Sequence, residues 1–393
     1  MSSTRYSSDP DDFSPERHLA SGLISGINIG LNTIGRVARA RTEHERHCMV
    51  WLHNYARMMQ LTADSLGTDL GLSLIEIREA LTDPRCTHMQ KFCEAVGALR
   101  THFEASIPKL VRNRVYRAVE NGIEEASDDK VFGLIIGPER IGKSEAMLDI
   151  FQRKYMHRGI LFSCSESRDM RTFICDNAAP LGINVSRAKK NDSIRQQVID
   201  IYTSGAIDTI FMDEIQRIWP SDLATQFPEK IEFMRTAWDK AELIRRVRRG
   251  RDGGGGLAII GNATPQFADD LNTAIAENRR WKPGQFEGRM RRTYTPETLT
   301  ETEVRNIARH TAPEFDEQSI ERLTTVTLAS PGLLGFLSNV VGKIRFKARK
   351  DNREISPDLV GEAAREMLQG TTTEKRAKEA ARKAAAQQRS LPQ

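Results

Sequence analysis

The sequence lacks the features that mark secreted and membrane proteins. Its cysteines form no CxxC pair and have no spacing to histidine that is typical of zinc; they are Cys48, Cys86, Cys93, Cys164 and Cys175. No apolar run is long enough to cross a bilayer, and the opening MSSTRYSSDPDDFSPERH has no signal-peptide core. These absences predict a cytoplasmic protein with reduced thiols and no membrane partner.

The sequence also has little net charge. The formal charge is only +5, although 28% of the residues are charged. This balance permits a nucleic-acid partner without requiring one. Basic residues are nevertheless clustered, in the stretch 245–251 and in the C-terminal segment EKRAKEAARKAAAQQR. The C-terminal segment has no apolar face that could pack onto a core, so we expect 371–393 to form a disordered basic tail.

The order of apolar patterns predicts five regions along the chain. Residues 1–41 are polar and then rich in glycine and serine, which predicts a flexible arm. Residues 42–126 have helical patterns only. Within 127–298, strand-like runs at 131–137, 159–165, 208–214 and 256–262 alternate with helical segments, which predicts a parallel α/β sheet covered by helices on both faces. Helical patterns return over 299–370, ahead of the tail at 371–393.

The N-terminal helical region contains a candidate helix-turn-helix. The segment TADSLGTDLGLSLIEIREALTD predicts a short helix, a turn around Gly71, an N-cap at Ser73 and a second helix through Leu81. In DNA-binding proteins the second helix of such a unit enters the major groove. The alternative is an ordinary helical hairpin, because short helix pairs joined by a glycine turn are common.

The strongest motif is GPERIGKS at 137–144, which matches G-x-x-x-x-G-K-[ST] between a predicted strand and a predicted helix. Glycines let the backbone curl so that its N–H groups face phosphates, and the helix directs its positive end at the anion. Lys143 would reach the β- and γ-phosphates, and Ser144 would hold Mg²⁺. The predicted ATP-binding residues are Gly137, Pro138, Glu139, Arg140, Ile141, Gly142, Lys143, Ser144 and Glu145.

Two later strands end in polar residues that suit hydrolysis. Asp213 and Glu214 close a hydrophobic strand; Asp213 would hold Mg²⁺, and Glu214 would polarise the attacking water. Asn262 ends the next strand, GLAIIGN, which we expect beside the Asp-Glu strand, so its side chain would face the γ-phosphate and the water. The alternatives are a solvated acidic pair and an asparagine that caps a turn.

An arginine cluster follows the last of these strands, in GQFEGRMRRTYTP. In oligomeric ATPases an arginine from such a region reaches the γ-phosphate of a neighbouring subunit and stabilises charge in the transition state. Arg289 is our first candidate for this role and Arg292 the second, with Arg291 between them. The alternative is a surface cluster that contacts solvent or a phosphate backbone.

The order of these motifs resembles that of the AAA+ ATPases: phosphate loop, Asp-Glu strand, asparagine-tipped strand, arginine cluster and C-terminal helical lid. The segments FSCSESRDMRTFICDNAAPLGI, IIGN, EGRMRRT and SPGLLGFLSNVV look more like the transposition-targeting ATPases, a family that includes the B protein of phage Mu. The resemblance covers roughly residues 60 to 345. It implies a P-loop AAA+ α/β domain with an N-terminal helical domain and a helical lid.

The resemblance also implies a function. Such proteins use ATP and Mg²⁺ to oligomerise on double-stranded DNA without strong sequence preference, recruit a transposase, and are released on hydrolysis. The sequence departs from the family pattern at two places. Gly335 stands where a lid arginine is common, which puts nucleotide sensing by the lid in doubt. The segment 219–256 is longer than in a minimal member of the family. The alternatives are a replication initiator or helicase loader and a signalling switch ATPase that does not bind DNA.

The long segment contains a dense run of arginines followed by four glycines. In ring and filament ATPases this region faces the central axis, where DNA would pass, and a phosphate backbone needs dense positive charge without base reading. We therefore predict a flexible DNA-binding loop, with a solvated hinge as the alternative. The predicted DNA-binding residues are Arg245, Arg246, Arg248, Arg249 and Arg251.

Overall fold

The computed structural model describes residues 30–38, 40–167, 169–185, 190–248, 256–278, 280–281, 283–330 and 332–368. Contacts divide the described residues into two compact units. Unit 1 draws on Met1–Leu110, Arg117–Gly137 and Lys143–Thr295, and unit 2 draws on Val111–Tyr116, Pro138–Gly142 and Pro296–Gln393. The N-terminal helices and the sheet therefore belong to the same unit, and the domain boundaries expected from the sequence remain predictions.

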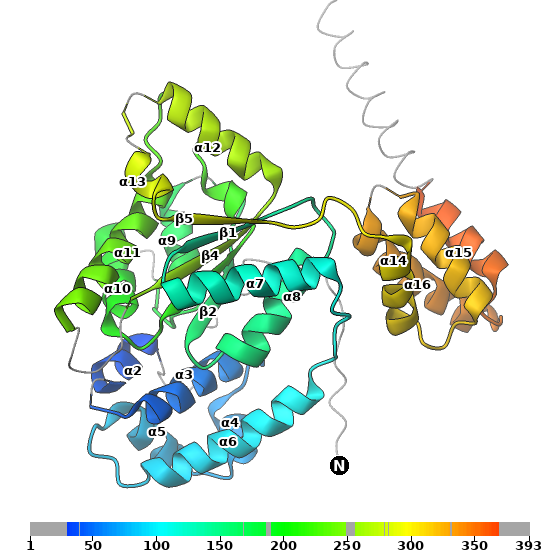
Figure 1. Ribbon diagram of the computed structural model, residues 1–393. Coiled ribbons are helices and arrows are strands. Elements are labelled where there is room, and N and C mark those ends of the chain that lie inside the picture. The colour runs from blue at the N-terminus through cyan, green and yellow to red at the C-terminus, as the bar shows by residue number, and fades with distance from the viewer. Residues whose placement is uncertain are drawn as a thin grey trace, which may run out of the picture. The chain divides into compact units, whose positions relative to one another are not determined.

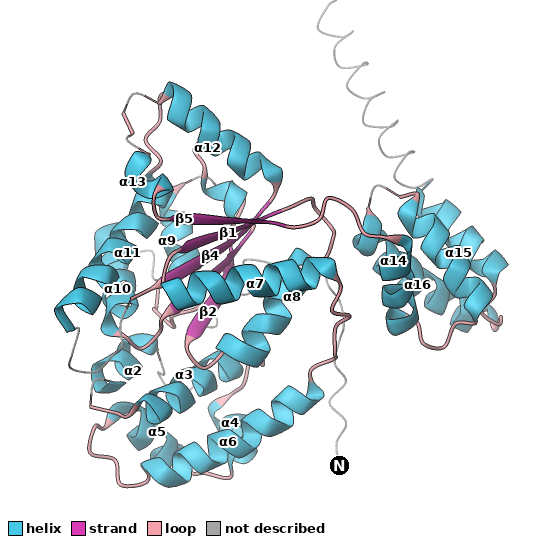
Figure 2. Ribbon diagram, in the orientation of Figure 1, coloured by secondary structure: helices cyan, strands magenta, loops and turns pink. Residues whose placement is uncertain are grey.

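A parallel five-stranded sheet forms the centre of unit 1 (Figure 2). Its strands are β1 (Phe132–Ile136), β2 (Gly159–Ser163), β3 (Thr209–Asp213), β4 (Ala258–Ala263) and β5 (Met290–Tyr294), in the order β2-β3-β4-β1-β5. Every pairing is parallel, and β4 lies between β3 and β1, so the expected neighbours β3 and β4 are confirmed. The sequence did not predict β5, because MRRTY is mostly polar and the strand lies at an edge of the sheet.

Helices cover both faces of the sheet (Figure 1), which confirms the expected α/β class. The covering elements are α7 (Arg114–Asp129), α8 (Lys143–Ile150), the π-helical turn η2 (Phe151–Tyr155), α9 (Met170–Ala178), α10 (Asn191–Ser204), η3 (Ile215–Ile218), α11 (Glu229–Arg248), α12 (Pro265–Glu277) and α13 (Gly284–Glu287). On one face, η2 packs Phe151 and Tyr155 against Phe211 of β3, with ring centroids 5.5 and 5.2 Å apart. On the other face, α13 packs Phe286 against Phe132 of β1, at 5.1 Å.

Helix α7 approaches the sheet closely because β1 has a glycine at the contact. A Cβ at Gly133 would lie 2.5 Å from the Cβ of Ala126, well inside van der Waals contact. Gly133 and Ala126 together therefore set the spacing between α7 and β1. The same strand is buried along its whole length, as expected for a strand with a helical layer on each side.

Ahead of α7, the described part of the chain contains five helices: α2 (Leu31–Ala38), α3 (Glu43–Met58), α4 (Ala63–Leu70), α5 (Leu74–Thr82) and α6 (Met89–Ser106). The expectation of a flexible arm over 1–41 is wrong for α2, where Leu31 and Ile34 are fully buried; residues 1–29 lie outside the described part. Helix α3 attaches this region to the sheet. The side-chain amide of Asn54 donates to the carbonyls of Met156 and Gly159, at 2.8 and 2.7 Å.

The backbone of the candidate helix-turn-helix is as expected. Gly71 ends α4 in the left-handed conformation, at φ 62°, which glycine adopts without strain. Ser73 caps α5, accepting from the N–H of Glu76, while the Glu76 carboxylate accepts from the N–H of Ser73. This capping box fixes where α5 begins. The segment therefore consists of two helices joined by a glycine turn, and its contact with DNA remains a prediction.

Unit 2 is helical, as the sequence indicates. It contains α14 (Glu301–Thr311), α15 (Glu317–Leu328), α16 (Leu333–Asp351) and a further helix over 357–368. Leu323 of α15 and Val340 of α16 are fully buried, so the unit has a core of its own. Gly335 lies in the first turn of α16. Among the described residues, no helix combines the length and apolarity needed to cross a membrane.

Candidate active site

Four of the predicted site residues in unit 1, Lys143, Ser144, Asp213 and Asn262, meet at the carboxyl edge of the sheet. Lys143 and Ser144 begin α8, just beyond the end of β1. Asp213 is the last residue of β3, and Asn262 lies near the end of β4, in register with Ile135 of β1. Parallel strands present their carboxyl ends on one edge, where ligands of open α/β sheets bind.

The phosphate loop has the conformation that its glycines permit. Gly142 has φ 94°, and Arg140 also adopts a left-handed conformation, at φ 59°. Ile141 is fully buried. The Lys143 ammonium donates to the carbonyl of Gly137 at 2.8 Å, and only 6% of this residue is exposed. The ammonium is therefore held at the carboxyl end of β1, because Gly137 directly follows this strand.

Three side chains from three elements share one hydrogen-bonded cluster. The Ser144 hydroxyl donates to Oδ1 of Asp213 at 3.1 Å. The Asn262 amide donates to the same oxygen at 2.6 Å and to the Ser144 hydroxyl at 3.1 Å. The structure therefore brings together Ser144, Asp213 and Asn262, as the sequence predicts, and Asn262 is a member of the cluster and not merely a turn cap.

The cluster suits a magnesium ion and a polarised water. A serine hydroxyl and a carboxylate are the oxygen ligands that Mg²⁺ takes from proteins, with phosphates and water completing the octahedron. Asn262 is 4% exposed, and its Oδ1 finds no hydrogen-bond partner among the described residues. A buried acceptor without a partner is costly, and a water could satisfy it. Ser144 and Asp213 could thus hold the metal, with Asn262 oriented toward a water.

Glu214 follows Asp213 in a left-handed conformation, at φ 55°. Its N–H donates to Oδ1 of Asp213 at 3.0 Å, so the backbone turns away from β3 at this point. The carboxylate accepts from the side-chain amide of Gln216 at 2.7 Å and lies 3.5 Å from the guanidinium of Arg217. Sequence reasoning missed Gln216 and Arg217, whose only signal was their position directly after the Asp-Glu pair.

The other predicted ATP-binding residues lie along the same loop. Pro138 is half-buried, whereas Glu139, Arg140 and Glu145 are exposed. Glu145 is in the first turn of α8, where a carboxylate favours the helix.

The arginine cluster lies at a different place in unit 1. The carbonyl of Arg289 accepts from the N–H of Phe132 at 3.2 Å, which puts Arg289 beside the start of β1, at the amino edge of the sheet. Its guanidinium is 3.2 Å from Asp239 and lies over the ring of Trp238, at 5.1 Å. Arg291 pairs with Asp129 at 2.6 Å and Arg292 with Glu287 at 3.5 Å. None of the three joins the cluster around Asp213.

The predicted DNA-binding loop is wrong for its first three arginines. Arg245, Arg246 and Arg248 belong to α11, which extends to Arg248. Sequence reasoning missed this 20-residue helix. Both Arg245 and Arg246 bind the carboxylate of Glu242, at 2.6 and 2.9 Å. Arg249 and Arg251 lie outside the described residues.

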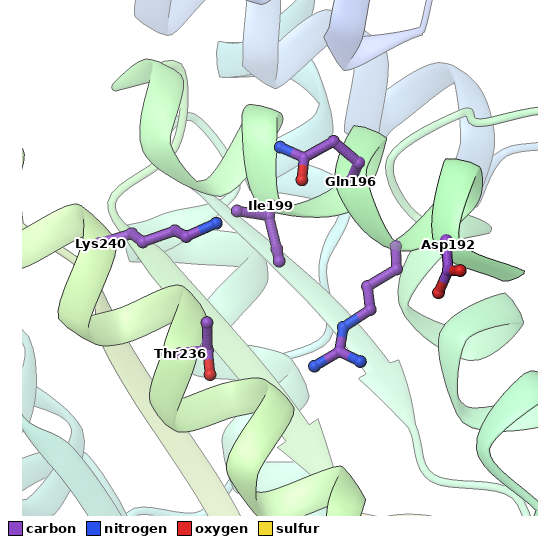
Figure 3. Close-up of a pocket in the computed structure, with 6 residues that line it drawn as sticks. Asp192, Gln196, Ile199, Thr236 and Lys240 are labelled. Carbon is purple, nitrogen blue, oxygen red and sulfur yellow. The ribbon is translucent and has the colours of Figure 1, made fainter.

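A surface depression lies between α10 and α11, with a volume of about 310 Å³ (Figure 3). It is lined by Asp192, Arg195, Gln196, Ile199, Thr236 and Lys240. None of these residues belongs to the predicted active site. The candidate site is therefore the cluster at the carboxyl edge of the sheet and not this depression.

Comparison with known proteins finds similarity to solved structures only. Neither a protein-family model nor a curated protein matches the chain. Among solved structures, domain III of the Thermotoga maritima replication initiation protein DnaA aligns with a TM-score of 0.40 at 12% identity, over 66% of this chain and 94% of that one. The Thermotoga maritima RuvB Holliday junction branch migration motor aligns with a TM-score of 0.38 at 12% identity, over 65% and 68%.

Proposed function

We propose that this chain is an AAA+ ATPase that binds ATP with Mg²⁺ and hydrolyses it. The observation that carries the proposal is the cluster of Ser144, Asp213 and Asn262 beside the buried Lys143, at the carboxyl edge of a parallel sheet. A hydroxyl, a carboxylate and an amide that share hydrogen bonds, next to a phosphate loop, match the requirements of phosphoryl transfer.

Each residue has a task in this proposal. Backbone N–H groups of the loop and of the N-terminus of α8 bind the phosphates, and Lys143 offsets their charge. Bound Mg²⁺ would neutralise charge that develops on the phosphate oxygens. Glu214 accepts a proton from the attacking water, which Asn262 orients through its Oδ1. Because the Glu214 carboxylate contacts Gln216 and Arg217, it must turn toward that water before it can act.

The test separates nucleotide binding from hydrolysis. Lys143→Ala should abolish binding of a fluorescent ATP analogue, because the ammonium is removed from the mouth of the loop. Glu214→Gln should keep nucleotide affinity and lower the rate of phosphate release by about a hundredfold or more. Glu166→Gln is the matched control for Glu214→Gln, since the exposed Glu166 contacts the same Arg217 at 3.6 Å. Lys190→Ala, at an exposed lysine, is the control for Lys143→Ala.

Two results contradict these assignments. Unchanged affinity in Lys143→Ala would remove the loop from the nucleotide site. Normal turnover in Glu214→Gln, or an equal loss in Glu166→Gln, would exclude Glu214 as the base.

We further propose that the ATPase binds the backbone of double-stranded DNA as an oligomer and acts with a transposase. Arg246 is mostly exposed on the last turns of α11, with 69% of its side chain accessible, and the run of arginines continues beyond the described end of that helix. A helix end that leads into further arginines suits phosphate contacts without base reading. The sequence resemblance supports the transposase, and hydrolysis would then release the oligomer from DNA.

Alanine at Arg245, Arg246, Arg248, Arg249 and Arg251 tests the DNA contact. DNA affinity should fall, and the dependence of log affinity on log salt should flatten by about 0.9 for each phosphate that the variant no longer neutralises. ATP affinity should stay unchanged, because Arg245 and Arg246 bind Glu242 and take no part in the cluster around Asp213. The control is alanine at Arg309, Arg345 and Arg349 of unit 2. DNA affinity that survives in the five-alanine variant would identify the segment as a solvated hinge.

One observation favours a second function, a switch ATPase whose N-terminal helices bind a protein. Helix α5 exposes 36% of Leu74 and 70% of Ile75, and it carries Glu76 and Glu79 against a single arginine, Arg78. An apolar and acidic surface suits a protein partner better than a phosphate backbone. Ile75→Glu should therefore leave DNA affinity unchanged if the arginines of α11 are the DNA contact, and a loss of DNA binding would return α5 to the role of recognition helix.

A further inference from the structure

The structure gathers a histidine and two cysteines that the sequence keeps apart. His44 and Cys48 are one turn apart on α3, and Cys93 lies on α6, which packs against α3. The Cys48 sulfur is 3.8 Å from Nε2 of His44, and the three ligand atoms all lie within 4.8 Å of one another. The sequence expectation that no histidine spacing suits zinc overlooked this group, because its third member comes from a distant helix.

The separations are close to those of a tetrahedral zinc site. With Zn–S bonds of about 2.3 Å and Zn–N bonds of about 2.0 Å, tetrahedral angles put nitrogen and sulfur about 3.6 Å apart and two sulfurs about 3.8 Å apart. The observed 3.8 Å between His44 and Cys48 needs almost no adjustment, and the remaining pairs need only small side-chain rotations. Thiolate and imidazole are soft ligands, which favour zinc over magnesium or calcium.

The group is also accessible. Cys48 and Cys93 are each 7% exposed, whereas His44 is exposed at the surface of α3. The imidazole of His44 is therefore accessible to an incoming metal ion, and both sulfurs lie within 4.8 Å of its ligand nitrogen. Position i and position i+4 on one helix present their side chains on the same face, so His44 and Cys48 are oriented together by α3 alone.

We propose that His44, Cys48 and Cys93 bind one zinc ion, with water as the fourth ligand. On binding, Zn²⁺ forms two Zn–S bonds and one Zn–N bond, and the two thiol protons pass to solvent. The ion links α3, which is hydrogen-bonded to the segment before β2, to α6. The site is independent of the proposed ATPase function, since it shares no residue with the cluster around Asp213.

The test is zinc stoichiometry and affinity on the full chain. After treatment with EDTA and a reductant, the protein is titrated with Zn²⁺ against a chromogenic chelator, and bound metal is counted by mass spectrometry. We expect one equivalent per chain and a Tm that rises with zinc concentration, because the metal binds only the folded arrangement. Co²⁺ in the same site should give a thiolate-to-cobalt charge-transfer band.

Variants identify the ligands. Cys48→Ser and Cys93→Ser should each abolish binding of the one zinc ion per chain. His44→Ala should weaken zinc affinity by about tenfold or more. His44 is exposed, so its loss leaves the core intact and keeps the test valid if a cysteine variant misfolds. Cys86→Ser and Cys175→Ser are matched controls that should still bind one zinc ion per chain. Asp213→Ala should bind it too, which separates this site from the cluster that would hold magnesium.

Three outcomes overturn the proposal. The first is zinc binding that is equal in wild type and Cys48→Ser, and the second is an affinity that His44→Ala leaves unchanged. The third is a reduced protein that takes up no zinc and instead forms a Cys48–Cys93 disulfide under mild oxidation, which would make the pair a redox couple.

Discussion

At the scale of single residues, Glu242 controls how much positive charge the end of α11 presents. Its carboxylate accepts from the guanidinium of Arg245 at 2.6 and 2.7 Å and from that of Arg246 at 2.9 Å. The hydrogen bonds from Arg245 lower the pKa of Glu242 to about 2, so the carboxylate is ionised at neutral pH. Two of the arginines proposed to bind DNA are therefore already neutralised in part within the chain.

Glu242→Gln should raise DNA affinity. The substitution removes one negative charge and frees two guanidinium groups, so the dependence of log affinity on log salt should steepen by about 0.9 for each further phosphate that the protein neutralises. Fluorescence anisotropy with a labelled duplex at several salt concentrations measures this. Glu229→Gln removes the same charge at the opposite end of the same helix and should change affinity far less. If both variants behave alike, net charge and not the arginine cluster determines binding.

The sequence was sufficient to predict site residues that a local motif or the end of an apolar strand marks. Lys143 and Ser144 follow a strand and begin a helix, and Asp213 ends another strand, so motif and periodicity locate them. The sequence could not predict Gln216 beside the Glu214 carboxylate, since that contact depends on the left-handed turn at Glu214. It also could not predict Cys93 beside Cys48, because no local pattern encodes the packing of two distant helices.

At the scale of elements, the junction between α3 and the segment before β2 is sensitive to acid. His157 follows η2 and packs edge-on against His47 of α3, with ring centroids 4.5 Å apart. Burial lowers the pKa of His157 to about 3, and the positive charges of His47, Arg100 and Arg158 add to the effect, with Asp208 opposing it. The fold therefore requires His157 to be neutral.

The protein should lose stability as the pH falls below about 6.5. An unfolded chain protonates this histidine near its ordinary pKa of 6.5, and the folded chain does so only near 3. The unfolded state thus binds the extra proton in that window, and the free energy of unfolding falls by up to about 1.4 kcal/mol per pH unit. Urea unfolding at pH 7 and pH 5 should show a smaller decrease for His157→Asn than for wild type. His102→Asn, at an exposed position on α6, should lose as much free energy of unfolding between pH 7 and pH 5 as wild type does. An equal loss in wild type and both variants would exclude His157 as the cause.

Elements with strong apolar periodicity were predictable, and polar ones were not. Strands β1, β3 and β4 are almost wholly buried and read as continuous apolar runs. Strand β5 pairs with β1 on one side only, and its MRRTY sequence shows no such run. Helix α11 ends in arginines that suggest a loop by composition, but in the structure Arg245 and Arg246 pair with Glu242 one turn back, and the helix extends to Arg248.

At the scale of the whole molecule, the distance between two edges of one sheet decides how Arg289 could act. Arg289 precedes β5 at the amino edge, whereas Ser144 and Asp213 lie at the carboxyl edge. A five-residue strand is about 16 Å long, which exceeds the reach of an arginine side chain. If Arg289 takes part in hydrolysis, it must therefore act on the nucleotide of another copy of the chain, and a head-to-tail assembly would supply that geometry.

Mixing two inactive variants tests this arrangement. Arg289→Ala and Glu214→Gln should each hydrolyse ATP slowly alone, while both keep nucleotide affinity. In a random equal mixture, about one quarter of the interfaces join an intact Glu214 to an intact Arg289 of the neighbour, so about one quarter of the wild-type rate should return. Arg291→Ala is the matched control, because Arg291 lies two residues further along the chain, in β5, and pairs with Asp129; this variant alone should hydrolyse ATP at nearly the wild-type rate. A mixture of Arg289→Ala and Glu214→Gln that stays as slow as its components would exclude action between subunits and leave Arg289 as a partner of Asp239 within its own chain.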